Sequence, residues 1–157
     1  MSLKLTKTFQ QEAPILLAIQ QEAFQEDLLK YEDHATSPAN ETIERLQLKI
    51  EQFEYFTIRY DNKIIGGIDI RIFENHHYRL NRIYIATAFQ NKGLGSQIMK
   101  LIEKQFSNAR SWSLDTPQLN TRNQYFYEKF GYIKVGEHRL SDKLTLFDFE
   151  KIMTHES

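Results

Sequence analysis

Two glycines at the start of an apolar segment are the first residues whose spacing could do chemistry. The stretch QNKGLGSQIM, residues 90–99, follows a strand-like segment and then becomes helix-like. Unpaired backbone N–H groups and the helix dipole make such a helix start favourable for an anion, and glycine lets the backbone approach a ligand closely. Gln90 and Lys92 could add side-chain donors. We therefore predict a phosphate or pyrophosphate site, against the alternative of a turn that only starts a helix.

Two common phosphate-binding motifs do not fit this loop. A P-loop ends in Gly-Lys-Ser/Thr, whereas Gly95 is followed by Ser96 and Gln97. A Rossmann fingerprint requires a small residue where this chain has Ile98. Neither motif therefore identifies the class of ligand.

A second set of polar side chains lies in NTRNQYFYEKFGY, residues 120–132. Asn120, Asn123 and Tyr127 recur at intervals of three and four residues. If Asn120 caps a helix, Asn123 lies near the helix start and Tyr127 lies one turn further along the same face. The alternative is a helix cap and a tyrosine that only packs in the core.

Hydrophobic periodicity predicts the elements that must position these residues. The expected order is β-α-α-β-β-β-α-β-α-β-β, an α/β or α+β fold with a mixed sheet. No repeat or linker interrupts it, so we expect a single domain over residues 1–157. The Gly66-Gly67 pair is expected to mark a bulge. The predicted strands are 3–9, 55–60, 63–73, 78–86, 111–116, 132–140 and 144–150, and the predicted helices are 14–31, 41–53, 94–106 and 121–130.

The first two helices are expected to be amphipathic. Gly131 is expected to end the last helix as its C′ residue. The apolar positions at helical spacing are Ile15, Ile19, Ala23 and Phe24 with Leu16 beside them in the first helix, and Ile43, Leu46 and Ile50 in the second.

Composition excludes several classes of protein. The net charge of -1 gives no basic field for nucleic acid or an anionic membrane. The absence of cysteine excludes disulfides, thiolate catalysis and cysteine-ligated zinc, and we expect no metal. No apolar run has the length of a signal peptide or approaches the roughly 18 residues of a membrane span. We expect a soluble, cytoplasmic protein.

The two stretches together resemble the GNAT superfamily of acyl-CoA-dependent N-acetyltransferases. Its first motif is Leu-x-Val, about four residues, and then Gln/Arg-x-x-Gly-x-Gly/Ala, which here reads IYIATAFQNKGLG. Its later motif is Asn-x-x-Ala/Ser-x-x-Phe-Tyr-x-x-x-Gly-Phe, which here reads NTRNQYFYEKFGY. The resemblance covers the whole order of elements and implies a mostly antiparallel central sheet flanked by helices.

The resemblance also implies a reaction and a site. The chain would be an enzyme that moves an acetyl group from acetyl-CoA to an amine by direct attack in a ternary complex. Tyr127 would protonate the leaving thiolate, and a backbone N–H near Ile85 would stabilise the oxyanion. The residues implied to bind acetyl-CoA are Ile83, Tyr84 and Ile85 beside the pantetheine arm, Gln90, Asn91, Lys92, Gly93, Leu94, Gly95 and Ser96 around the pyrophosphate, and Asn120 and Asn123.

The chain departs from the family pattern in three places. A frequent proline is Thr87, and the Ala/Ser of the later motif is Asn123. The glutamate that some members use as general base is Asn81, which cannot accept a proton near neutral pH. The base therefore stays open: a water-mediated route or a neutral amine that needs little help are alternatives. The side-chain candidates, each expected to be a solvated surface residue, are Asp69, Glu74, His76, His77 and His34.

Residues 22–33 contain five acids and one base, which could attract a cationic amine or simply form a solvated helix face. The acids are Glu22, Glu26, Asp27, Glu32 and Asp33. Tyr31 and other aromatics could line an apolar pocket instead. A longer acyl group and a non-catalytic acyl-CoA sensor or interaction module remain alternative functions. The closing strands could leave an edge for a homodimer.

Overall fold

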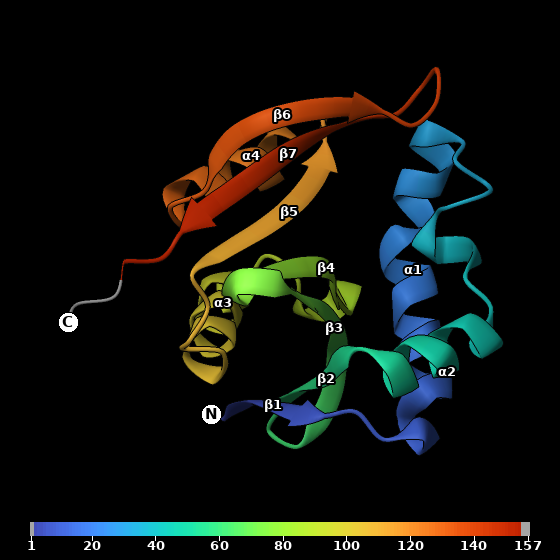
Figure 1. The fold of residues 1–157 in the computed structure, drawn as a ribbon. Coiled ribbons are helices and arrows are strands. Elements are labelled where there is room, and N and C mark those ends of the chain that lie inside the picture. Colours follow the sequence, from blue (N-terminus) through green and yellow to red (C-terminus); the bar gives the residue numbers. More distant parts are fainter. Residues whose placement is uncertain (1, 155–157) are drawn as a thin grey trace.

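In the computed structural model, which describes residues 2–154, seven strands and four α-helices follow the predicted order (Figure 1). The predicted fold class is confirmed. The strands are β1 (Leu3–Lys7), β2 (Glu54–Tyr60), β3 (Lys63–Phe73), β4 (His77–Ile85), β5 (Ser111–Pro117), β6 (Ile133–Arg139) and β7 (Thr145–Ile152). The helices are α1 (Ala13–Tyr31), α2 (Ile43–Gln52), α3 (Leu94–Gln105) and α4 (Thr121–Lys129), and short 3-10 turns cover Gln10–Glu12, Pro38–Asn40, Glu74–His76 and Thr87–Phe89.

The strands form one sheet in the order β1-β2-β3-β4-β5-β7-β6, and only the β4–β5 pair is parallel in the described residues. That parallel pair is short, because its register ends at Arg79 opposite Ser113 although both strands continue. Figure 1 shows the two strands diverging beyond this point. Backbone groups of β4 that point away from β3 consequently have no partner in the opening among the strands of residues 2–154.

The helices cover the sheet on both faces. On one face, α1 and α2 bury Leu16, Leu46 and Ile50 against Tyr55 and Tyr84. On the other face, α3 and α4 pack over a larger core that includes the buried side chains of Ile98, Ile102, Trp112, Tyr127 and Phe149. None of the helices within residues 2–154 is long and apolar enough to cross a bilayer.

Local signals set several helix ends. The Thr42 side chain accepts from the backbone N–H of Arg45 and starts α2. Gly131, at φ 108°, follows the end of α4 and takes the predicted C′ position. Phe9 does not extend β1 as predicted, because its backbone N–H donates to the Glu12 carboxylate and begins the following 3-10 turn.

The predicted apolar stripe of α1 is confirmed at Ile19, Ala23 and Phe24, which pack against the core, but it is wrong at Ile15. Ile15 is half exposed, while its neighbour Leu16 is fully buried. Gln20 and Tyr31 are buried on the inner side as well. A stripe that includes a glutamine is difficult to recognise from apolar spacing, which explains why Ile15 was placed on it and Gln20 was not.

Two irregularities shape the centre of the sheet. The β2–β3 register shifts next to Gly66, so the predicted bulge is confirmed, and Ile65 is the extra residue. A second shift pairs Asp69 with Arg82 but Ile70 with Leu80, which leaves Asn81 as an extra residue in β4. This second bulge lies where β4 separates from β5.

Replacing Gly67 with alanine should destabilise the fold. An added Cβ would lie 2.4 Å from the Tyr84 hydroxyl and 2.6 Å from the adjacent ring carbon. That ring is buried and its hydroxyl lies 2.6 Å from the Tyr55 hydroxyl, so it cannot move aside easily. We expect a loss of about 1–3 kcal/mol in the free energy of unfolding, measured by urea denaturation.

Gly136→Ala provides the matched control on strand β6. A Cβ there would meet only the Asp148 carboxylate, at 3.7 Å. Its unfolding free energy should stay within about 0.5 kcal/mol of the wild type. Equal stability of the two variants would contradict the proposed role of Gly67.

Candidate functional site

The opening between β4 and β5 continues into a long groove with a cavity volume of about 830 Å³. It runs between α1 on one side and the starts of α3 and α4 on the other. The sequence-predicted site residues that line it are Ile83, Tyr84, Ile85, Gln90, Asn91, Gly93, Leu94, Gly95, Ser96, Asn120, Asn123 and Tyr127. Lys92 is exposed and does not line the groove, although it lies in the same loop.

The start of α3 suits an anion. Gly93 is its N-cap residue at φ 75°, and no side chain in the described part of the protein accepts from the first N–H groups of this helix. A Cβ at Gly93 would meet nothing within 4 Å, so this backbone borders open space. Gly95 has a different role, because its Cβ would lie 3.3 Å from the Phe126 ring and its hydrogen permits close packing of α3 on α4.

The loop before α3 is connected to the end of β4. The Gln90 side chain donates to the Ile85 carbonyl oxygen at 2.8 Å. Tyr84 contributes to the groove through its backbone edge while its ring packs beneath the sheet against α1 and α2. The sequence motif thus brings a strand edge and a helix start into one groove.

Helix α4 supplies the polar side chains on the opposite wall. Asn120 caps the helix, since its Oδ1 accepts from the Asn123 backbone N–H at 3.0 Å. The Asn123 side-chain amide lies 3.5 Å from the Thr116 hydroxyl. Tyr127 is 8% exposed and its hydroxyl makes no hydrogen bond to any residue in the described range 2–154. Burial, and secondarily the charge of Asp115, raises the pKa of Tyr127 to about 12.

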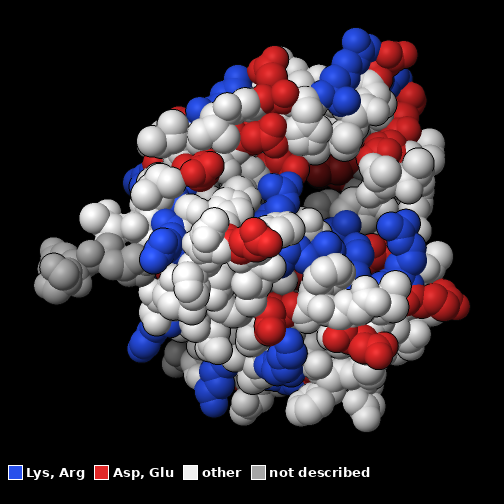
Figure 2. Space-filling view, in the orientation of Figure 1, with Lys and Arg blue, Asp and Glu red and all other residues white. Residues whose placement is uncertain are grey.

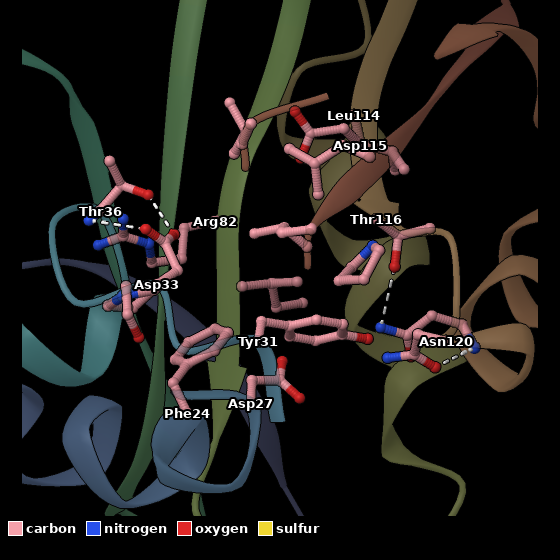
Figure 3. A pocket seen from close by; sticks show the side chains of 18 of the residues that line it. Phe24, Asp27, Tyr31, Asp33, Thr36, Arg82, Leu114, Asp115, Thr116 and Asn120 are labelled. Carbon is pink, nitrogen blue, oxygen red and sulfur yellow. Dashed lines mark hydrogen bonds between the residues drawn. The ribbon is translucent and has the colours of Figure 1, made fainter. Parts of the chain in front are cut away.

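A small pocket of about 250 Å³ adjoins the groove. Figure 3 shows Phe24, Asp27 and Tyr31 on one side, Asp115, Thr116 and Asn120 on the other, and Arg82 with Asp33 near the far end. In Figure 2 a hollow lies in this part of the molecule, with acidic side chains above it and basic side chains below it. The residues that line both this pocket and the long groove are Phe24, Asp27, Tyr31, Ile83, Asn120, Asn123 and Tyr127.

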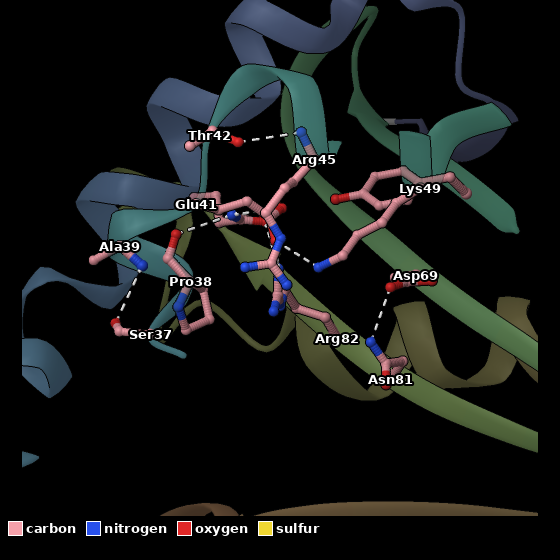
Figure 4. Close-up of polar contacts among 12 residues, drawn as sticks. Ser37, Pro38, Ala39, Glu41, Thr42, Arg45, Lys49, Asp69, Asn81 and Arg82 are labelled. Atoms are coloured by element: carbon pink, nitrogen blue, oxygen red, sulfur yellow. Dashed lines mark hydrogen bonds and ion pairs between the residues drawn. The ribbon is translucent and has the colours of Figure 1, made fainter. Parts of the chain in front are cut away.

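Asn81, at the position of the family's glutamate, holds a buried carboxylate instead of serving as a base. Its amide donates to Asp69 Oδ2 at 2.9 Å, as Figure 4 shows. Arg71 donates to both oxygens of the same carboxylate, at 3.0 and 2.9 Å. The expectation that Asp69 is a solvated surface residue is wrong, because it is fully buried and its oxygens are already occupied.

The other base candidates do not line either cavity. Glu74, His76 and His34 are exposed, as expected. His77 is only half-buried at the β4–β5 junction, where its two ring nitrogens contact the hydroxyls of Ser111 and Ser113.

The acidic residues between 22 and 33 divide by position. Glu22 accepts from the Thr87 hydroxyl, and Glu32 pairs with Lys143 at 2.6 Å. Glu26 lines the long groove, whereas Asp33 lines the small pocket and Asp27 lines both. The acidic segment is therefore partly a cavity wall and partly solvated surface.

One cluster could hold a metal by the type of its side chains. Asp115, His138 and Asp148 each place a ligand atom within 4.8 Å of the others. Arg79 already donates to Asp115 at 2.6 Å, and His138 contacts Asp148 at 3.0 Å. A guanidinium at the site supplies the positive charge that a metal would bring, so this chemistry favours an ion-pair cluster.

The sequence analysis considered the acids of residues 22–33 and Tyr31 only for the acceptor, so it missed the contribution of α1 to the acyl-donor groove. The residues that it did not assign to the acyl-donor site include Ala23, Phe24, Asp27, Lys30 and Tyr31 on α1, and Arg122 and Phe126 near the start of α4. Asp27 and Tyr31 are four residues apart, the spacing that places two side chains on one helix face.

Comparison with known proteins agrees with this geometry. The family model for the "Acetyltransferase (GNAT) family" matches residues 15–132. The chain is similar to the PaiA N-acetyltransferase of Thermoplasma acidophilum in complex with coenzyme A, with 18% identity, a TM-score of 0.75, and coverage of 98% of this chain and 100% of that chain. It is also similar to the ribosomal-protein-S18-alanine N-acetyltransferase of Escherichia coli, with 13% identity, a TM-score of 0.79, and coverage of 99% and 97%. At these identities the structural likeness is one of fold.

Proposed function

The chain belongs to the acetyltransferase (GNAT) family, and from that premise we propose that it transfers the acetyl group of acetyl-CoA to a primary amine. The observation that carries the proposal is a single groove. It joins the uncapped start of α3, the open edge of β4 and the Tyr127 side chain. A smaller pocket opens beside the same tyrosine and offers a place for the acceptor.

The residues of the groove fit acetyl-CoA. The unpaired N–H groups at the start of α3 suit the pyrophosphate, and Lys30 and Arg122 on the groove walls add positive charge. The open backbone edge of β4 at Ile83–Ile85 can pair with an extended amide-containing arm. Acetyl-CoA supplies the acetyl group as a thioester, and the chain's residues orient it and move protons.

Tyr127 is proposed as the acid. Its hydroxyl belongs to a wall shared by groove and pocket, and no described residue competes for its proton. A pKa of about 12 keeps the phenol protonated at neutral pH, so it can donate to the sulfur as the carbon–sulfur bond breaks. A free backbone N–H near Ile85 would stabilise the charge that develops on the acetyl oxygen.

Calorimetric titration with acetyl-CoA, followed by an assay with a panel of primary amines, tests the function. Micromolar binding of acetyl-CoA and desulfo-CoA, no binding of adenosine, and amine-dependent release of CoA are expected. Binding without turnover on any amine would support the sensor alternative. No binding at all would remove both.

Replacing Gly93 with valine should weaken acetyl-CoA binding at least about 10-fold, or roughly 1.4 kcal/mol. The side chain would occupy open space in the groove, and φ 75° is unfavourable for a β-branched residue. Gly131→Val is the control, since φ 108° imposes comparable strain outside both cavities. It should lose stability and retain the acetyl-CoA Kd. A folded Gly93→Val protein with wild-type Kd would exclude the phosphate-loop assignment.

A further inference from the structure

Three carboxylates line the small pocket, and they differ in what they contact. Asp115 accepts from Arg79 at 2.6 Å. Asp33 accepts from the backbone N–H and the hydroxyl of Thr36. Asp27 has neither a hydrogen bond nor an ion pair with any residue between 2 and 154, the range that the structure describes. It is the pocket carboxylate whose lone pairs are free to accept a proton.

The position of Asp27 is as distinctive as its lack of partners. Unlike Asp33 and Asp115, it lines both the small pocket and the long groove. Tyr127 and Ile83 line both cavities as well, so Asp27 lies on α1 at the junction where an acceptor nitrogen would meet an acetyl group. Figure 3 shows its carboxylate projecting from α1 beside Tyr31 and toward the opposite wall.

The surroundings increase the basicity of this carboxylate. Burial raises the pKa of Asp27, the charge of Lys30 opposes that shift, and Glu26 adds to it. The pKa of Tyr31 is raised by burial and by the charge of Asp27. The charged and titratable groups that border the same space from other elements are Asp33 on the following loop, Arg82 on β4, Asp115 on β5, and Arg122 and Tyr127 on α4.

We propose that Asp27 is the general base, the group that takes the proton lost by the acceptor amine. This inference rests on the proposed acetyl transfer. It places the proton acceptor on α1, because Asn81 on β4 is an amide that already donates to Asp69. In the family members that use the strand glutamate the base lies on the strand, so this chain would reach the same nitrogen from the helix on the other side.

Two side chains, Asp27 and Tyr127, account for the protons that move in the reaction. The amine nitrogen bonds to the acetyl carbon and the carbon–sulfur bond breaks. The nitrogen proton goes to the Asp27 carboxylate, and the Tyr127 proton goes to sulfur. Asp27 then returns its proton to the Tyr127 phenolate through water in the open groove, which restores both groups. A carboxylate suffices because the nitrogen becomes cationic, and therefore strongly acidic, as it bonds to carbon. An acceptor that arrives as an ammonium loses its first proton to solvent.

Asp27→Asn tests the proposal, with Glu22→Gln as the control. The control removes one charge from the same helix at an exposed position outside both cavities. Wild type is first titrated with acetyl-CoA and assayed with phenethylamine, butylamine and spermidine. Values of kcat and KM are then measured against pH for the best of these amines.

Asp27→Asn should lower kcat about 100-fold and remove the acid limb of the pH profile, while the acetyl-CoA Kd stays within about threefold of wild type. Asp27→Glu should recover part of the rate together with the limb, and Glu22→Gln should behave as wild type. An unchanged kcat and acid limb in Asp27→Asn would overturn the assignment. So would a raised amine KM with unchanged kcat, which would make Asp27 a binding group only. A wild type that binds acetyl-CoA but acetylates none of the amines would count against the proposed function and, with it, the base.

Discussion

Tyr127→Phe should lower kcat by about 100-fold or more and leave the acetyl-CoA Kd nearly unchanged. Phenylalanine preserves the ring that packs against Phe126 and Tyr132 but removes the proton proposed for the leaving sulfur. Because the hydroxyl makes no hydrogen bond to a described residue, its loss leaves no buried partner unsatisfied. Steady-state kinetics and calorimetry on the same preparations measure the two quantities.

Tyr125→Phe is the matched control. It lies on the same helix, is 69% exposed and lines neither cavity, so its kinetics should equal those of wild type. If Tyr127→Phe also retains full turnover, another group must protonate the sulfur.

The pH dependence of Tyr127 has a defined sign. A raised pKa means that the protonated, neutral phenol persists above pH about 10, where an ordinary tyrosine ionises. Loss of this proton should therefore not reduce turnover at or below pH about 10. The stability associated with the neutral ring is present below pH about 10 and is lost as pH rises through the folded pKa of about 12.

Local sequence patterns were sufficient for the elements and for several of their ends. The helix start at Asn120 and the turn at Gly131 depend on residues close in sequence, so they could be predicted. The bulge at Asn81 and the early end of the β4–β5 pairing could not. Both depend on the register between strands, which is fixed by packing across the whole sheet.

The grouping of the candidate site residues was predictable to the same extent. The glycine loop and the α4 side chains are short motifs, and the structure brings them into one groove. Asp27 looked like one acid among five, because nothing in its neighbourhood distinguishes it from Glu22. Only the folded structure shows that Asp27 lines both cavities and that Glu22 lines neither. Asp69 was misassigned because its burial and its partner Asn81 on the neighbouring strand become apparent only with the strand register, although Arg71 lies two residues further along the same strand.

Glu41→Gln should cause the largest loss of stability among these variants, about 3–5 kcal/mol in the free energy of unfolding. The Glu41 side chain is 4% exposed, and one of its oxygens accepts from Lys49 at 2.5 Å and from Arg82 at 3.1 Å (Figure 4). A neutral amide would leave two largely buried cations facing each other without a counter-charge. Urea denaturation measures the loss, and Glu54→Gln is the control. Glu54 pairs with Lys7 at a site where both side chains are over 40% exposed, so that change should cost about 0–1 kcal/mol.

The ion pairs of Glu41 with Lys49 and Arg82 also predict a pH dependence, which separates the effect of the carboxylate charge from that of side-chain packing. Burial alone would raise the pKa of Glu41, but the hydrogen bond from Lys49 and the charge of Arg82 outweigh it and hold that pKa below 4.5. A lowered folded pKa contributes stability above the unfolded value, and this contribution is lost as pH falls through the folded pKa. The stability difference between wild type and Glu41→Gln should therefore be full near neutral pH and shrink in acid below pH 4.5. A difference that persisted unchanged in acid would assign the effect of Glu41 to packing.

Since Arg82 and the neighbouring Pro38 line the small pocket, loss of the Glu41–Arg82 ion pair should also raise the amine KM more than the acetyl-CoA Kd.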